Sequence, residues 1–258
     1  MTRDASIVEL ADWLQTAPGR YLLAWEQQRL DVAVADRFGF HALQLGLPEL
    51  DALRANRMPQ RWLAQDGQEQ QPAARVVLRC DFDALPFASN SLDLIVLPHA
   101  LELSRDPHQT LREVERVLRP EGRLVINGFN PVSLWGLRQN CGRLLGANRR
   151  LFMPRAGEYI GYWRLRDWLR LLSFEVEAAE FGGYAPPLRS EKWLDRWSWI
   201  ERIGKRWWPV LGAVYFVVAV KRVHGMRLVG LAKRSARARQ AAPAVITQNT
   251  HKHSQKHQ

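Results

Sequence analysis

Polar side chains stand at the ends of several apolar runs of the sequence, where a sheet would present them to a ligand. Asp81 follows the run 75–80, and a carboxylate there can accept hydrogen bonds from amino or hydroxyl groups. His99 follows the run 91–97, and its imidazole titrates near neutral pH, which makes it a candidate general base. Both also have a structural interpretation, because Asp81 can cap a turn or helix and His99 can pack or cap a helix.

Three more polar residues follow the same apolar runs. Glu102 lies three residues after His99, and we expect it on the surface of a helix. Asn127 and Asn130, in the sequence INGFNP, come at the end of the run 121–129 and are candidates to line a substrate pocket.

Segments with strand patterns alternate with segments of helical spacing along most of the chain. The strands are expected over 41–45, 61–64, 75–80, 91–97, 121–129, 174–181 and 213–222. The helices are expected over 5–38 with a break at 17–19, from Pro48 over 48–56, and over 106–118, 165–172 and 192–203. This order predicts an α/β, doubly wound and mainly parallel sheet, whose ligands bind beyond the carboxyl ends of the strands.

Length and cysteine content restrict the class of protein. The chain has 258 residues, which suits one large domain. Its two cysteines, Cys80 and Cys141, lack the spacing of metal ligands, and no metal site is predicted. The start MTRDASIVEL lacks the basic and then apolar order of a signal peptide, so we expect a cytoplasmic protein.

The net charge of +11 is concentrated at the C-terminus. Residues 221–258 hold nine of the 37 Lys and Arg and no acid, so the rest has 28 basic and 26 acidic residues. Such a tail can attract nucleic acid or an anionic membrane surface, although a solvated, disordered end is the simpler expectation. The apolar run 207–220 is shorter than the roughly 20 residues that span a bilayer, so no transmembrane segment is predicted.

The segment RCDFDALPFASNSLDLIVL, residues 79–97, resembles the class I S-adenosylmethionine-dependent methyltransferases with a type 11 domain. The matching positions are Asp81, Leu85-Pro86-Phe87, Ser91 and Asp93. Two later segments, 111–126 and 165–176, resemble further motifs of this family, and the resemblance covers about residues 38–222. Three motifs in the correct order are much more specific than one.

The resemblance implies a Rossmann-like sheet of seven strands with one antiparallel strand, and S-adenosylmethionine as cofactor. Carried over from the family, Asp81 accepts a hydrogen bond from the adenine amino group, and the backbone of Phe82 meets the ring. No chemistry is assigned to Asp93, at a strand start. The other residues expected around the cofactor are Gln44, Gly46, Leu47, Leu97 and His99.

The first motif of the family is altered in this chain. Gln44 occupies the position of an acidic residue, Gly46 matches the first glycine, and Pro48 and Leu50 replace the other two. Proline fixes its own backbone angle and removes an N–H donor. The ribose-binding acid is also unclear, because Asp66 and Glu69 are the only candidates and a solvated loop residue is the simpler interpretation of Asp66.

The sequence thus predicts three parts: a helical segment 1–37, a methyltransferase-like domain 38–222 with an insertion or lid at 131–163, and the basic tail 223–258. The expected activity is methyl transfer from S-adenosylmethionine to an unidentified small-molecule acceptor. The alternative is a non-catalytic scaffold or regulatory protein, associated with RNA or membrane through its tail. Aromatic and arginine residues in 131–163 suit an aromatic or anionic acceptor, RNA, or an ordinary amphipathic helix.

Overall fold

The computed structural model describes residues 3–66, 78–144, 152–154, 159–187 and 200–222. By internal contacts the chain divides into Met1–Val223 and His224–Gln258, and all described residues belong to the first unit. The basic tail, Glu69 and parts of the expected lid lie outside the described residues, so the predictions made for them stay predictions.

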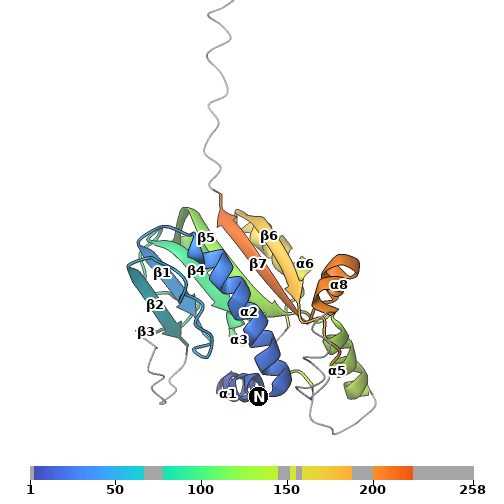
Figure 1. Ribbon diagram of the computed structural model, residues 1–258. Helices are drawn as coiled ribbons and strands as arrows, with labels where there is room; N and C mark the ends of the chain where they lie inside the picture. The colour runs from blue at the N-terminus through green and yellow to red at the C-terminus, as the bar shows by residue number, and fades with distance from the viewer. Residues whose placement is uncertain (1–2, 67–77, 145–151, 155–158, 188–199, 223–258) are drawn as a thin grey trace, which may run out of the picture. The chain divides into compact units, whose positions relative to one another are not determined.

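A seven-stranded sheet forms the centre of the first unit (Figure 1). Its strands are β1 (His41–Leu45), β2 (Gln60–Gln65), β3 (Leu78–Arg79), β4 (Leu92–Pro98), β5 (Leu118–Phe129), β6 (Phe174–Gly182) and β7 (Val214–Lys221). Their order in the sheet is β3-β2-β1-β4-β5-β7-β6. Neighbouring pairs among β1 to β5 are parallel, whereas β7 is antiparallel to both β5 and β6. The predicted sheet, with its one antiparallel strand, is confirmed.

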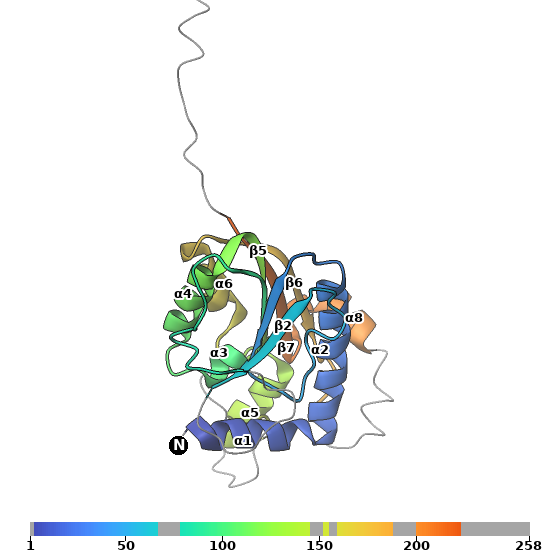
Figure 2. The ribbon, with the colours of Figure 1, turned by 90° about the vertical axis from the view of Figure 1, so that its left-hand side faces the viewer.

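Helices lie on both faces of this sheet, as Figure 2 shows with α2 on one side and α4 and α6 on the other. The described helices are α1 (Arg3–Leu14), α2 (Ala17–Ala35), α3 (Ala100–Leu103), α4 (Pro107–Val117), α5 (Leu134–Leu144), α6 (Tyr162–Leu171), α8 (Ile200–Trp207) and the short 3-10 helix η1 (Pro209–Leu211). Each face buries its own apolar cluster. Strands β4 and β7 are buried along their whole length, as continuous apolar runs predict. No helix of the described segments is long and apolar enough to cross a membrane.

The N-terminal helical region breaks two residues earlier than its sequence indicates. Residues 17–19, the expected break, instead form the first turn of α2. Thr16 caps this helix, because its hydroxyl oxygen accepts a hydrogen bond from the backbone N–H of Gly19 at 3.4 Å. Proline is tolerated in a first turn, since the N–H that it lacks has no partner inside the helix.

The helix expected over 48–56 is absent, and this prediction was wrong. Turns connect β1 to β2 across residues 46–59. Two buried amide side chains hold this connection: Gln44 binds its backbone, and Asn56 ties it to α2 and the residues that follow α2. Asn56 donates to the carbonyl of Val34 at 2.8 Å and accepts from the N–H of Met58 at 2.9 Å.

Candidate functional site

The turn after β1 has a backbone that favours glycine. Gly46 has φ = +77°, and Leu47 follows at φ = +43°. A Cβ atom at Gly46 would lie 3.6 Å from the Cβ of Ala100 and 3.7 Å from the ring of Phe82, which are ordinary contacts. The left-handed conformation, and not a lack of space, is therefore what requires glycine at this position.

Gln44 holds this turn from inside the protein. Its Nε2 donates to the carbonyl oxygens of Gly46, Leu47 and Leu50 at 3.2, 3.0 and 2.7 Å, and its Oε1 accepts from the N–H of Ala52 at 3.0 Å. The side chain is only 3% exposed. The structure thus gives Gln44 a positioning role in the loop, with its amide donors and acceptor engaged by the backbone.

Two carboxylates stand at the carboxyl ends of the neighbouring strands β2 and β3. Asp66 directly follows β2 and is buried, while Asp81 lies two residues after β3 and is exposed. One oxygen of Asp81 accepts a hydrogen bond from the N–H of Asp83 at 3.0 Å. Burial, together with the negative charges of Asp66 and Asp81, raises the pKa of the Cys80 thiol to about 11. The buried position of Asp66 differs from the solvated loop that the sequence indicated.

The loop after Asp81 is fixed by α4 on the side away from α2. Arg116 donates to the carbonyl oxygens of Leu85 and Phe87 at 3.0 and 2.9 Å, and Glu113 accepts from the N–H of Leu85 at 3.0 Å. The Leu85-Pro86-Phe87 segment is therefore held in place by α4. Phe82, at 2% exposure, and Leu97, at 0%, have side chains buried in the core on this face.

His99 lies between two buried carboxylates. Its Nε2 is 2.9 Å from Oε1 of Glu26 in α2, and its Nδ1 is 2.8 Å from Oε2 of Glu102 in α3. All three side chains are at most 3% exposed. Burial alone would lower the pKa of His99, but the two carboxylates outweigh it and raise the pKa to about 10. With both ring nitrogens engaged, the geometry gives no support to His99 as the base for an acceptor.

Glu102 and Glu26 were not assigned these roles from the sequence. Glu102 was expected on a helix surface, but its other carboxylate oxygen accepts the N–H of Phe129 at the end of β5. Glu26 could have been noticed, because it interrupts the apolar series Leu22, Leu30 and Val34 at helical spacing. An acid in the buried stripe of a helix requires a partner, which His99 supplies.

Asn127 and Asn130 differ in their surroundings. Asn130 donates to the carbonyl oxygens of Val210 and Gly212 at 2.6 and 2.9 Å and accepts from the N–H of Val132, so it fixes the turn after β5. Asn127 is 2% exposed, and neither polar atom of its side chain has a hydrogen-bond partner among the described residues. Asn127 therefore remains the candidate of the two for contact with a ligand.

Asp93 has a structural role, in agreement with the sequence. One of its oxygens accepts the N–H groups of Phe40 and His41 at 2.8 and 2.9 Å, and the other pairs with Arg119. This carboxylate stands at the amino end of β4, away from the ends of the strands where Asp66 and Asp81 lie.

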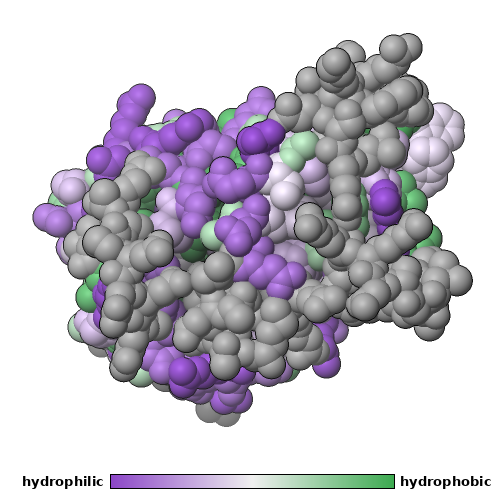
Figure 3. All heavy atoms as spheres, turned by 90° about the horizontal axis from the view of Figure 1, so that it is seen from below, coloured by the Kyte–Doolittle hydropathy of each residue, from purple (hydrophilic) through white to green (hydrophobic). Residues whose placement is uncertain are grey.

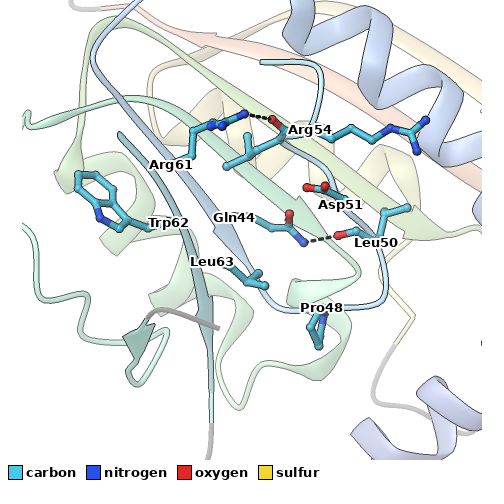
Figure 4. Close-up of a pocket in the computed structure, with 9 residues that line it drawn as sticks. Gln44, Pro48, Leu50, Asp51, Arg54, Arg61, Trp62 and Leu63 are labelled. Carbon is cyan, nitrogen blue, oxygen red and sulfur yellow. Dashed lines mark hydrogen bonds between the residues drawn. The ribbon is translucent and has the colours of Figure 1, made fainter. Parts of the chain in front are cut away.

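A pocket of about 210 Å³ lies between β2 and the turns that follow β1 (Figure 4). Gln44 and Leu63 border it from the strands, while Pro48, Asp51 and Arg54 come from the turns. Neither Asp66 nor Asp81 lines this pocket. Its volume is below the roughly 300 Å³ at which small-molecule sites begin. We therefore place the candidate site at the strand ends, where ligands of parallel sheets bind.

Comparison with known proteins agrees with this fold. Residues 54–126 match the family described as Methyltransferase domain. The chain is 33% identical to the uncharacterized protein YafS of Escherichia coli over 231 residues, which cover 87% of this chain and 86% of YafS. It is 30% identical over 145 residues to the malonyl-[acyl-carrier protein] O-methyltransferase of Laribacter hongkongensis, across 53% of this chain and 46% of that protein.

A solved structure shows the same fold at low sequence identity. The SAM-dependent methyltransferase of Thermotoga maritima is 14% identical to this chain, with a TM-score of 0.55 over 79% of this chain and 90% of that one. Sheet order, the motifs at 79–97 and these similarities lead to one assignment. The chain belongs to the family of YafS, and by family match and fold it has a class I methyltransferase domain.

Proposed function

We propose that the chain binds S-adenosylmethionine at the carboxyl ends of β1 to β4 and transfers its methyl group to a small-molecule acceptor. The observation that supports this most is the placement of two carboxylates, Asp66 and Asp81, at adjacent strand ends beside the left-handed turn at Gly46. Carboxylates accept hydrogen bonds from hydroxyl and amino groups, which are the groups that an adenosine presents.

The residues present fit the adenosine part of the cofactor. In this proposal Asp81 accepts from the adenine amino group and Asp66 accepts from the ribose hydroxyls. Gly46 contributes a close approach of the backbone and no hydrogen bond, because its N–H donates to Ala64 and its carbonyl oxygen is bound by Gln44. When bound, the cofactor supplies a methyl group on a sulfonium, which an acceptor removes by in-line displacement.

His99 acts in this proposal as a positioning residue. Its imidazolium holds Glu102 of α3, and Glu102 in turn holds the backbone at the end of β5. Together they fix the connection after β4, which has the left-handed angle φ = +53° at His99 itself. The chain's contribution to methyl transfer is then alignment and exclusion of water, which need no proton from His99.

Calorimetric titration can separate this proposal from a fold that has lost its cofactor. We expect S-adenosylmethionine and S-adenosylhomocysteine to bind, and adenosine to compete with both. Methionine should compete much less, because the altered first motif lies at that end of the site. An Asp66→Asn variant should bind more weakly than wild type if Asp66 meets the ribose. A folded protein that binds neither cofactor form would favour the scaffold interpretation.

A further inference from the structure

Exposed apolar residues gather at one edge of the sheet. Six of the eleven large apolar side chains that are exposed among the described residues lie in the turn after β5, in α5, in α8 or directly after α8. These six, which we call the apolar rim, are Val132, Leu134, Leu137, Ile203, Trp207 and Trp208. Because β7 runs antiparallel, its start pairs with the ends of both β5 and β6, so all six belong to the same edge.

Hydrogen bonds bring the two halves of the apolar rim together. Asn130, just before Val132, donates to the carbonyl oxygen of Val210 at 2.6 Å, and Val210 lies just after Trp208. The indole of Trp135, in α5, donates to the carbonyl oxygen of Ala185 after β6 at 2.7 Å. Figure 3 views the molecule from this lower side, and pale and apolar residues appear at its right-hand margin, where Figure 1 places α5 and α8.

Helix α8 presents opposite faces to the protein and to solvent. A Cβ atom at Gly204 would lie 2.4 Å from the ring of Tyr184, so this side is pressed against the fold. Glu201 also points inward, where it accepts the N–H of Tyr184 at 2.8 Å and the hydroxyl of Tyr21. Ile203 and Trp207, four residues apart, are 38% and 70% exposed and lie on the outer side.

Helices α5 and α8 are basic in sequence. They hold five basic residues against one acid, and the two basic side chains that the structure describes, Arg138 and Arg206, are exposed. That acid is Glu201, whose carboxylate is already bound inside the fold. Exposed tryptophan beside arginine is the composition that settles at the boundary of headgroups and acyl chains of an anionic bilayer. Docking onto an anionic bilayer requires an apolar face flanked by positive charge, and it does not require shape complementarity.

We propose that the apolar rim docks the protein onto an anionic lipid bilayer, with Trp207 and Trp208 at the boundary and the arginines among the headgroups. This edge continues the carboxyl ends of β4 and β5, where Asn127 and the candidate site lie. Docking would therefore bring the site close to molecules held in the membrane. The proposal concerns a surface and does not depend on methyl transfer.

Vesicle flotation with the full chain tests the docking. Two kinds of vesicle are used, phosphatidylcholine alone and phosphatidylcholine with about one third phosphatidylglycerol. We expect wild type to float with the anionic vesicles. Trp207→Ser combined with Trp208→Ser should lower the partition coefficient about tenfold or more, and Arg206→Gln should lower it about fivefold.

Matched controls distinguish docking through the apolar rim from two other causes of a changed partition coefficient. These are loss of folding in a variant and binding through the basic tail. Phe38→Ser and Leu171→Ser remove side chains that are 82% and 83% exposed outside the apolar rim, and they should float as wild type does. Thermal unfolding of each variant confirms that it is folded. The proposal is overturned if wild type does not bind anionic vesicles, which would leave the apolar rim for a protein partner. It is also overturned if the tryptophan variants bind as well as wild type, because binding would then occur through the basic tail.

Discussion

At the scale of single residues, Glu26, His99 and Glu102 form a buried group of charged side chains. Two carboxylates share one imidazole, and all three side chains are excluded from water. The cost of burying the carboxylates is offset only while the imidazole is protonated and donates to both. Protonation of His99 is therefore coupled to the stability of the fold.

This coupling predicts a pH dependence of unfolding. The pKa of His99 is raised from 6.5 to about 10 in the folded protein, so its stabilising effect is complete below about 6.5 and is lost as the pH rises through 10. Burial also raises the pKa of Glu102. A raised carboxyl pKa likewise makes the free energy of unfolding fall as the pH rises, in a lower pH range than for His99. We expect the free energy of unfolding in urea to fall by up to about 1.4 kcal/mol per pH unit between pH 7 and 10.

The control for this prediction removes the titrating group. In His99→Asn the fall between pH 7 and 10 should largely disappear, although the variant is less stable throughout. An exposed histidine, His108, provides the matched comparison, because His108→Asn should keep the wild-type dependence. A wild-type protein whose stability is constant over this range would show that His99 is neutral in the fold.

Gln44 allows a second test at this scale, through a substitution that restores the acid typical of the family. A glutamate of the same shape cannot donate to the carbonyl oxygens of Gly46, Leu47 and Leu50, and it would repel them. We expect Gln44→Glu to destabilise the fold by about 2–4 kcal/mol, since buried carbonyl groups lose their donors. Chemical denaturation measures the change, and Gln60→Glu, at an exposed position in β2, should have little effect.

At the scale of elements, α2 packs against the core and also carries Glu26. Leu22, Leu30 and Val34 pack with the strands on one face of the sheet, and the intervening Glu26 reaches the end of β4. The N-terminal helices thus connect the core to the candidate site. Changes in α2 should therefore affect the stability of the whole first unit.

A pair of substitutions in α2 tests this packing. Leu30 is fully buried and Val32 is 70% exposed, two residues away in the same helix. We expect Leu30→Ala to lower the free energy of unfolding by about 3 kcal/mol, because it leaves a cavity in the core, and Val32→Ala to change it little. Equal effects of the two would show that α2 does not pack as described.

The elements that sequence patterns predicted well are those whose hydrogen bonds are local or whose faces are uniformly apolar. The strand 91–97 and the helix 106–118 both appear within one residue of their expected bounds. The connection 46–59 was mispredicted because Gln44 and Asn56 supply its hydrogen bonds from positions outside it or near its end. Helical spacing in a sequence carries no information about such tertiary partners.

At the scale of the whole molecule, the sequence indicated where the candidate site lies, but it did not indicate the buried contacts behind it. Asp81 could be placed at the strand ends because its motif is contiguous in the sequence. The contact between Glu26 and His99 joins residues 73 positions apart, and no pattern in either segment specifies it. Asp66 was one of two candidates for the ribose-binding acid in the sequence, and its place directly after the end of β2 supports it.

The central claim is that a fold with an altered first motif still binds its cofactor at Asp81. Calorimetry with S-adenosylhomocysteine tests it most directly, using wild type, Asp81→Ala and the exposed control Asp167→Ala. We expect wild type and the control to bind with a Kd below about 1 mM. Asp81→Ala should bind roughly 10- to 100-fold more weakly, as loss of a hydrogen bond to a charged group predicts. A folded wild type that shows no binding at millimolar ligand, or an Asp81→Ala variant that binds as wild type does, would contradict the claim.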